Sequence, residues 1–493
     1  MKSNQRWIPA ILAVLLLAGL AGCGSKKPEV SALTTEEQQT VPPVETEEDT
    51  RELEAKDVLG ERDLGEETIT FFARTGGNMW DVKSLYADEI LSEAINDAVY
   101  SRNEKLSQDF HFNVKIEPSG ATSYSQRLTN TILGNAYGFD VVTACGYDMA
   151  ELAVNGVLRD LTQVDGLNLD RSWWNTTLNS QLSVGNALFY LSGDIICEDN
   201  MAVRCIFFNK RLADAVDCSP DDLYQMAKDR TWTFEEMFSL AEKAYLDSDE
   251  TFGTSSGDRL GFVAQKVVAG YVLMTAAGVR LTSKDESDVP TLNSPLPDTV
   301  FSDITAYFAK DGVLIASDAL TPYKNGRALF MTEVLGTAAK VRDWDVETGI
   351  LPLPLYNSEQ TVYYHFADGN CLNLLALPTG NGKRLNDVVF MMEAMCIEST
   401  STLNPAFYDT CLRGRYSNDP ESWDMLDIIL NSYFIEDANL YKRAWGSLQD
   451  DIVSAMAEGQ SVTTVMERYS TSLPVLISET VEKLGRIANA QRK

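Results

Sequence analysis

Residues 139–148 read Phe-Asp-Val-Val-Thr-Ala-Cys-Gly-Tyr-Asp, an apolar run that ends in small and polar residues. This pattern predicts a buried β-strand followed by a loop. Two further strand-like runs precede it, at residues 68–72 and 111–116, and helical patterns separate the three. Alternation of strands and helices is typical of a parallel sheet, whose ligands bind beyond the carboxyl ends of the strands. We therefore predict an α/β fold with Tyr147 and Asp148 at its ligand-binding edge.

The first 22 residues have the composition of an export signal. Two basic residues precede an apolar run over residues 8–20, which is shorter than the ~20 apolar residues that span a bilayer. The run leads into Leu-Ala-Gly-Cys at residues 20–23, which closely resembles the lipobox of bacterial lipoproteins. The resemblance implies that residues 1–22 are removed and that Cys23 is diacylated. The alternative is an ordinary secretory signal with an incidental cysteine.

Residues 23–67 are predicted to form a disordered acidic linker. From Gly24 to Glu67 there are fourteen acidic and five basic residues, three prolines and no aromatic residue. Such a segment cannot bury enough apolar surface to fold by itself.

Composition excludes several classes of function. The chain has 41 basic and 72 acidic residues, a net charge of −31, which repels phosphate backbones and anionic lipid headgroups. We therefore expect no nucleic-acid partner and no membrane contact except through the lipid on Cys23. Seven other cysteines occur at scattered spacings without a Cys-x-x-Cys pair, and there are only two histidines. The sequence predicts neither a disulfide framework, nor a metal site, nor a cofactor.

Five short motifs follow one another along the body of the chain. They are Gly-Val-Leu-Arg-Asp-Leu (156–161), Phe-Asn-Lys (208–210), Thr-Trp-Thr-Phe-Glu-Glu (231–236), Asn-Gly-Arg-Ala-Leu-Phe (325–330) and Gly-Ile-Leu-Pro-Leu-Pro (349–354). In this order they resemble the carbohydrate-type (family 1) extracellular solute-binding proteins of bacterial ABC importers, over roughly residues 68–490. The chain is longer than the compact members of that family, chiefly after Asn404.

The resemblance implies a type II periplasmic-binding-protein-like fold, in which two α/β lobes enclose a ligand cleft. The N-terminal lobe would comprise residues 68–190 and about 365–400, and the C-terminal lobe about 191–364 and 401–493, with a helix-rich C-terminal region. The chain would cross between the lobes near residues 189–200 and again near residues 362–369, where Gly and polar residues can absorb a hinge rotation.

The function implied is the capture of a small solute, with an oligosaccharide as the expected ligand, and its delivery to an ABC permease. The protein would be a monomer, anchored by lipid at the extracellular face of the cytoplasmic membrane, and not an enzyme. A secreted carbohydrate-active hydrolase and a surface scaffold or adhesion lipoprotein are the alternatives. Gly-Thr-Ser-Ser-Gly at residues 253–257 matches the nucleophile elbow of α/β-hydrolases, but its polar surroundings favour an ordinary loop.

Sugar binding needs aromatic side chains against the apolar face of the ring and polar side chains for its hydroxyls. We predict ten ligand-binding residues from the crossings and the loops directed at the cleft: Trp80, Tyr147, Asp148, Trp174, Asp194, Glu198, Asp199, Tyr364, Asp368 and Arg413. Trp232 is instead predicted to pack in the core, because it precedes a helix that Thr233 caps.

Overall fold

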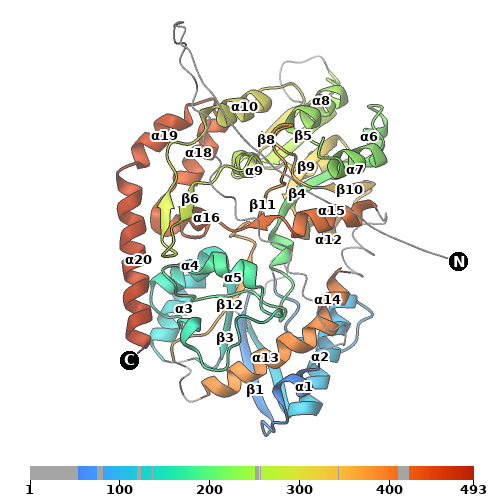
Figure 1. Ribbon diagram of the computed structural model, residues 1–493. Helices are drawn as coiled ribbons and strands as arrows, with labels where there is room; N and C mark the ends of the chain where they lie inside the picture. The colour runs from blue at the N-terminus through green and yellow to red at the C-terminus, as the bar shows by residue number, and fades with distance from the viewer. Residues whose placement is uncertain are drawn as a thin grey trace, which may run out of the picture. The chain divides into compact units, whose positions relative to one another are not determined.

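The computed structural model describes residues 54–74, 81–118, 124–135, 137–249, 255, 257–341, 343–380, 382, 384–408 and 421–492. Two sheets dominate these residues (Figure 1). The first has the strand order β12-β3-β1-β2, with β1 (Glu67–Ala73), β2 (Phe112–Pro118), β3 (Val141–Cys145) and β12 (Asn373–Ala376). The second has the order β10-β4-β9-β5-β8, with β4 (Arg204–Asn209), β5 (Leu260–Gln265), β8 (Val313–Ala316), β9 (Ala328–Val334) and β10 (Thr348–Leu351).

The first sheet confirms the predicted parallel arrangement. β1 pairs in parallel with both β2 and β3, and Phe71 lies opposite Ile116 on one side and Val141 on the other. All five residues of β3 are buried, as expected for a strand covered on both faces. The helices that belong to this part of the chain are α2 (Ala94–Phe110), α3 (Tyr124–Leu133), α4 (Gly146–Val154) and α13 (Leu385–Ser401).

Between the first two strands, the sequence has a helical pattern that places Leu85, Ile90, Leu91 and Ala94 on one face, and this pattern predicts a helix from Leu85 onward. The helix begins only at Ala94. Ser92 has a φ of 60°, a left-handed conformation that an α-helix does not accommodate. The side chains of Ile90 and Leu91, expected on the apolar face of the helix, are 61% and 54% exposed.

The second sheet is mixed, because β5 is parallel to β8 and β9 while β4 is antiparallel to β9 and β10. Its helices include α6 (Lys210–Asp214), α7 (Pro220–Lys228), α8 (Phe234–Ala244), α9 (Ala269–Ala276), α10 (Asp298–Phe308), α11 (Leu320–Lys324) and α12 (Ala338–Val341). Thr233 caps α8 as predicted, its hydroxyl accepting from the Glu236 backbone N–H at 3.3 Å. Trp232 is fully buried and donates to the Pro352 carbonyl at 3.0 Å, which confirms that it belongs to the core.

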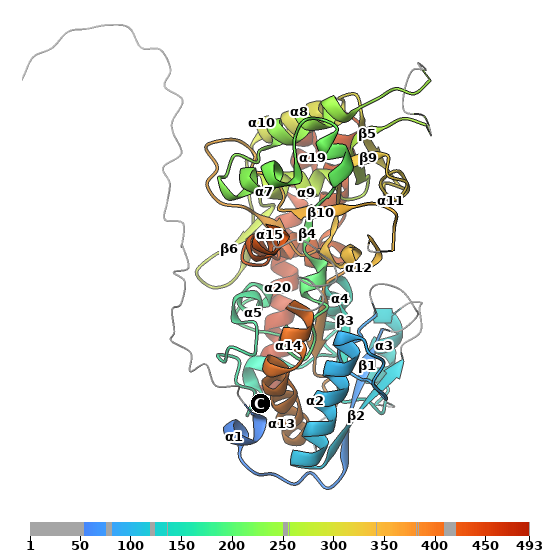
Figure 2. The same cartoon turned by 90° about the vertical axis from the view of Figure 1, so that its right-hand side faces the viewer.

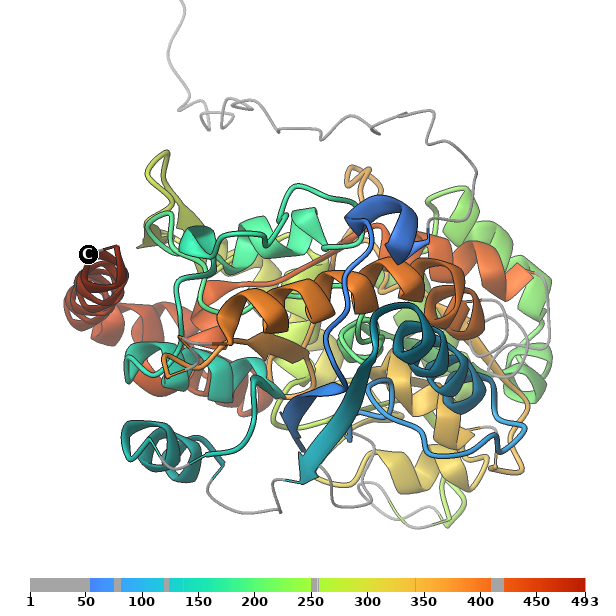
Figure 3. The same ribbon diagram turned by 90° about the horizontal axis from the view of Figure 1, so that it is seen from below.

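The prediction of a disordered linker up to Glu67 is wrong for residues 54–67. Helix α1 (Ala55–Leu59) packs against α13, and the two lie side by side in Figure 3. Ala55 is fully buried, and its backbone N–H donates to the buried Glu398 carboxylate at 2.7 Å. A polar composition did not prevent folding here, because partners more than 300 residues away supply the burial and the hydrogen bond.

The chain passes between the two sheets more than once. It leaves the first sheet after α4, follows α5 (Thr176–Leu182) and enters β4, and it returns from β10 to β12. Two small pairs accompany these passages, β11 (His365–Phe366) with β13 (Tyr433–Phe434) and β6 (Thr282–Lys284) with β7 (Pro290–Leu292). The turn between β6 and β7 reaches the segment after α5, where the Gly185 N–H donates to the Asp288 carbonyl at 2.8 Å.

The C-terminal helices contact elements of both sheets. They are α14 (Leu403–Pro405), α15 (Glu421–Leu430), α16 (Asp437–Leu440), α17 (Lys442–Trp445), α18 (Leu448–Ala457), α19 (Val462–Tyr469) and α20 (Ser472–Gln491). α15 packs on α7 and β10, whereas α16, α17 and α20 pack on α4. Figure 2 shows α20 running behind both halves of the folded body. None of the described helices is both long enough and apolar enough to cross a membrane.

Candidate functional site

A cavity of about 310 Å³ lies where three separate stretches of the chain meet. They are the segment before α5, the passage toward β4, and the residue that follows α14 by three positions. The residues that line it are Ser172, Trp174, Asn175, Thr176, Ser192, Gly193, Asp194, Ile196, Asp199, Asn200 and Tyr408. Two aromatic rings, two carboxylates, hydroxyls and amides therefore converge on one space, the combination that sugar recognition uses. We call this the crossing pocket.

A single buried glutamate fixes the aromatic wall of the crossing pocket. Glu393 of α13 accepts from the indole N–H of Trp173 at 2.7 Å and from that of Trp174 at 2.9 Å. Trp174 is fully buried, so that its ring is held in one orientation. A Cβ atom at Gly193 would lie 2.3 Å from Cε3 of the Trp174 ring, so only glycine allows this close approach.

Two carboxylates of the crossing pocket are largely withdrawn from water. Burial raises the pKa of Asp194 to about 7; the Asn404 side chain opposes that rise and the charge of Asp199 adds to it. Burial also raises the pKa of Asp199 to about 6. Asp199 accepts from the Ser192 hydroxyl and from the Asn200 N–H, and both hydrogen bonds favour its charged form.

Glu198 is close in sequence but has a different role. It is buried and accepts from the backbone N–H groups of Lys83 at 2.6 Å and Ser84 at 3.0 Å, and from the Ser84 hydroxyl. Glu198 therefore ties the chain after β1 to the passage that carries Asp194 and Asp199.

Tyr147 and Asp148 lie elsewhere, at the start of α4. The Tyr147 hydroxyl accepts from the Asn439 amide at 3.2 Å. Asp148 accepts from Arg443 at 2.7 Å, and its second oxygen is 3.8 Å from an Arg74 nitrogen. Both residues sit at the carboxyl edge of the first sheet, as predicted, but the partners in these contacts come chiefly from the C-terminal helices.

Asp368 belongs to a buried ion cluster at the edge of the second sheet. Arg204, at the start of β4, donates to Asp368 at 2.6 Å and to Glu333 at 3.2 Å. The other oxygen of Glu333 accepts from Gln265 at 2.6 Å. We call Arg204, Gln265, Glu333 and Asp368 the Arg204 cluster. It fastens the second passage of the chain to the sheet.

Tyr364 makes a third, separate set of contacts. Its ring lies 5.6 Å from the Arg280 guanidinium and close to Gly278, where a Cβ would be 3.0 Å from Cε2 of the tyrosine.

Of the ten predicted ligand-binding residues, Trp174, Asp194 and Asp199 come together in the crossing pocket, with Glu198 beside them. Tyr147, Asp148, Tyr364 and Asp368 do not line it. Trp80 and Arg413 lie outside the described residues. The roles of all ten in ligand binding stay predictions.

Sequence reasoning did not identify Tyr408, Asn175 and Ser192, which carry no distinctive local pattern. It also overlooked Arg204, for which a signal existed: a charged residue inside the apolar run Ala-Val-Arg-Cys-Ile-Phe-Phe at 202–208. Such a residue must find a partner when the strand is buried.

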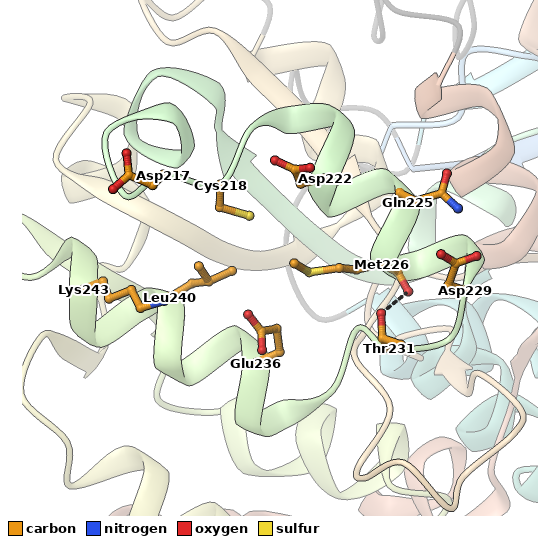
Figure 4. A pocket seen from close by; sticks show the side chains of 10 residues that line it. All are labelled: Asp217, Cys218, Asp222, Gln225, Met226, Asp229, Thr231, Glu236, Leu240 and Lys243. Atoms are coloured by element: carbon orange, nitrogen blue, oxygen red, sulfur yellow. Dashed lines mark hydrogen bonds between the residues drawn. The ribbon is translucent and has the colours of Figure 1, made fainter.

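A second cavity of about 310 Å³ opens between α7 and α8 (Figure 4). It is lined by Asp217, Cys218, Asp222, Gln225, Met226, Asp229, Thr231, Glu236, Leu240 and Lys243, and contains none of the predicted residues. Asp222 already closes the capping box of α7 with Ser219. This cavity has only aliphatic and thioether groups as apolar lining, so it offers no ring for stacking.

The residues proposed for a hydrolase do not form a catalytic arrangement within the described part of the chain. The Ser255 hydroxyl donates to Asp258 at 3.0 Å. His365 is buried, with Nε2 accepting from the Leu353 N–H and Nδ1 paired with Ser432. Burial lowers the pKa of His365 to about 3.

Oxygens of Asp247, Asp249 and Asp258 lie within 4.8 Å of one another, close enough to be considered as ligands of a metal ion. However, Asp258 already accepts hydrogen bonds from Ser248 and Ser255 on both of its oxygens. These hydrogen bonds account for its position without a metal.

No protein-family model matches this chain, and no curated protein sequence matches it. Solved structures do. A family 1 extracellular solute-binding protein from Bifidobacterium longum subsp. infantis matches with a TM-score of 0.51 at 13% identity, over 84% of this chain and 100% of that one. A cyclo/maltodextrin-binding protein in complex with maltotetraose matches with a TM-score of 0.54 at 13% identity, over 85% and 97%. The cyclic alpha-maltosyl-1,6-maltose binding protein from Arthrobacter globiformis matches with a TM-score of 0.59 at 13% identity, over 84% of this chain and 100% of that one. The chain thus has the two-lobed α/β fold of the extracellular solute-binding proteins.

Proposed function

We propose that this protein is the solute-binding receptor of an ABC importer and that it captures an oligosaccharide at the crossing pocket. The observation that carries the proposal is the convergence of aromatic, hydroxyl and carboxylate groups on one cavity at a passage between the two sheets. The fold supports it, because two of the similar structures are described as binding maltotetraose or a cyclic maltosyl-maltose.

The chemistry of the crossing pocket suits a sugar ring. Tyr408 is partly exposed, so a ring can pack against its face, and each such contact adds ~1 kcal/mol or more beyond simple burial. Asp194 offers a carboxylate, and Asn175 and Ser192 offer an amide and a hydroxyl for the sugar's hydroxyls. Because the passage through Asp194 and Asp199 connects the sheets, a bound solute would bias their relative rotation. Trp80, Tyr147, Asp148, Glu198, Tyr364, Asp368 and Arg413 are proposed to complete the ligand surface as the lobes close.

Delivery to a permease requires that the receptor stay at the membrane. We propose that Cys23 carries the lipid that tethers the chain, as a monomer, outside the cytoplasmic membrane. Replacing it by Cys23→Ser should release the protein from the membrane without changing its melting temperature. Detergent-phase partitioning of the wild type and of this variant measures the effect. Persistent partitioning of Cys23→Ser into the detergent phase would refute the lipid anchor.

The receptor function is tested by thermal shift and calorimetry on the mature chain carrying Cys23→Ser, with maltotetraose and a panel of other oligosaccharides, amino acids and peptides. A true ligand at 100 times its Kd should stabilise the fold by about 2.7 kcal/mol, and no product should form. Tyr408→Ala should weaken binding more than tenfold, about 1.4 kcal/mol. Tyr86→Ala, at a tyrosine that is 44% exposed and away from the pocket lining, is the matched control. Stabilisation by peptides alone would refute the sugar assignment.

A further inference from the structure

The charges around the crossing pocket are unbalanced. Its two carboxylates belong to Asp194 and Asp199, and among the described residues that line the cavity none is a lysine, an arginine or a histidine. Carboxylates can accept from the hydroxyls of a neutral sugar, but two neighbouring carboxylates without a cation are costly to withdraw from water. A cationic group on the ligand would offset that cost.

Within the described part of the chain, the next layer of side chains does not supply a cation either. The titratable groups that interact with Asp194 or Asp199 are Glu198, Tyr408, Tyr433 and Cys396, and Asp427 and Cys197 also act on Tyr408. Each of these groups is neutral when protonated and negative when deprotonated, so none of them supplies a positive charge. The buried Arg102 contacts the neighbouring Ile195, but its guanidinium donates to the backbone carbonyls of Ser84, Leu85 and Ile195 and to the Ser399 hydroxyl.

Existing hydrogen bonds only partly satisfy the two carboxylates. Asp199 receives the Ser192 hydroxyl and the Asn200 N–H, and Asp194 receives the Asn404 amide. These donors are neutral, so they supply no positive charge to balance an ionised carboxylate. A ligand ammonium group between Asp194 and the partly exposed Tyr408 would be held by a carboxylate and by the face of an aromatic ring, two contacts that favour cations.

We propose that the solute of the crossing pocket carries a protonated amine, and that the amine is bound by Asp194. The chemical class is a hydroxylated amine such as an oligosaccharide of amino sugars. This inference rests on the proposed receptor function and names the solute class more narrowly. Because the ammonium binds the charged form of Asp194, binding should displace the proton that burial keeps on this carboxyl near neutral pH.

The test compares two sugars of the same skeleton, the glucosamine tetramer and its N-acetylated counterpart, with maltotetraose as a third probe. Isothermal titration of the mature Cys23→Ser chain at pH 7 should show the free-amine tetramer binding at least tenfold more tightly than the N-acetylated one. Titration in buffers of different ionisation enthalpy should show release of the Asp194 proton, in addition to any proton that a neutral sugar amine takes up on binding. Between pH 5.5 and 7 the affinity for the protonated amine, corrected for the titration of the free sugar, should rise because the Asp194 carboxylate becomes populated.

Asp194→Asn should reduce the affinity ratio of the two tetramers at least fivefold and abolish the pH dependence. Asp229→Asn is the matched control, since Asp229 lines the other cavity between α7 and α8. Melting temperatures verify that both variants are folded. Equal or tighter binding of the N-acetylated tetramer or of maltotetraose would overturn the amine proposal while leaving sugar capture intact. A ratio unchanged by Asp194→Asn would also overturn it. Failure of all three sugars to bind would overturn both proposals.

Discussion

The two passages of the chain between the sheets both carry buried carboxylates, but they treat them differently. At the Arg204 cluster, Asp368 and Glu333 share one guanidinium, which is itself only 4% exposed. In the crossing pocket, the donors that the described residues offer to Asp194 and Asp199 are hydroxyl and amide groups. At the Arg204 cluster a cation ties two carboxylates into the fold, whereas in the crossing pocket the carboxylates line a cavity and remain available to a ligand. Neighbouring acidic residues can therefore be sorted by their partners, although the sequence alone makes them look alike.

The largest loss of stability should follow from removing the cation of the Arg204 cluster. Arg204→Met would leave Asp368 and Glu333 buried without their cation, which typically costs 3–5 kcal/mol of unfolding free energy, here about 4. Urea unfolding of the variant and the wild type measures this loss. Arg443→Met, at a partly exposed arginine that also binds an aspartate, should cost much less. Equal losses in the two variants would show that the buried Arg204 contributes no more to stability than the partly exposed Arg443.

A smaller effect is expected behind the pocket wall. Glu393→Ala would remove the acceptor shared by the indoles of Trp173 and Trp174 and by the Asn168 N–H. Leaving such buried donors unpaired should cost roughly 2–3 kcal/mol, and loss of the fixed Trp174 ring should also weaken solute binding. Glu393→Gln should restore part of both quantities. Unfolding free energy and calorimetric Kd, measured on the same preparations, test this. Unchanged binding in a destabilised Glu393→Ala variant would show that the orientation of the Trp174 ring does not contribute to solute binding.

The smallest expected change in stability comes from replacing one aspartate in each region by asparagine, and it has opposite signs in the crossing pocket and in the Arg204 cluster. Because burial raises the pKa of Asp194 to about 7, above the unfolded value of about 3.9, the folded chain holds more protons between those pH values. The contribution of Asp194 therefore becomes less favourable as the pH rises from about 4 to about 7, and it costs stability above that range.

Asp194→Asn should then raise stability by about 1 kcal/mol at pH 8, after allowance for its partial exposure, and have little effect at pH 4. Asp368→Asn should instead lower stability at pH 8, because it weakens the bond to Arg204. Melting temperatures at the two pH values decide both signs. A destabilising Asp194→Asn at pH 8 would indicate a cation partner for Asp194.

Local patterns predicted much of the fold. The strands at residues 68–72 and 139–144 and the Thr233 cap depend on neighbours in sequence, and the structure contains them. The failures depend on distant partners. Helix α1 folds because Glu398 and α13 receive it, and the helix expected from Leu85 starts late because Ser92 adopts a positive φ.

The candidate site was predictable only in part, for the same reason. Asp194 and Asp199 stand out as polar residues beside an apolar run, but their meeting with Tyr408 joins segments about 200 residues apart. The pairing of Asp368 with Arg204 likewise joins residues 164 positions apart. No window of sequence contains either contact.

Six cysteines fall within the described residues, and all six are buried and form no disulfide with one another: Cys145, Cys197, Cys205, Cys218, Cys371 and Cys396. Burial raises the pKa of Cys145 to about 12 and that of Cys218, which precedes α7, to about 11. It also raises the pKa of Cys205, Cys371 and Cys396. Only a thiolate attacks an oxidant or an alkylating reagent at a useful rate. A chain that is exported, as proposed above, can therefore carry these thiols without cross-linking, because they react only when the surrounding structure opens. The rate at which a maleimide labels these buried thiols would therefore measure how often the surrounding structure opens, without any introduced probe.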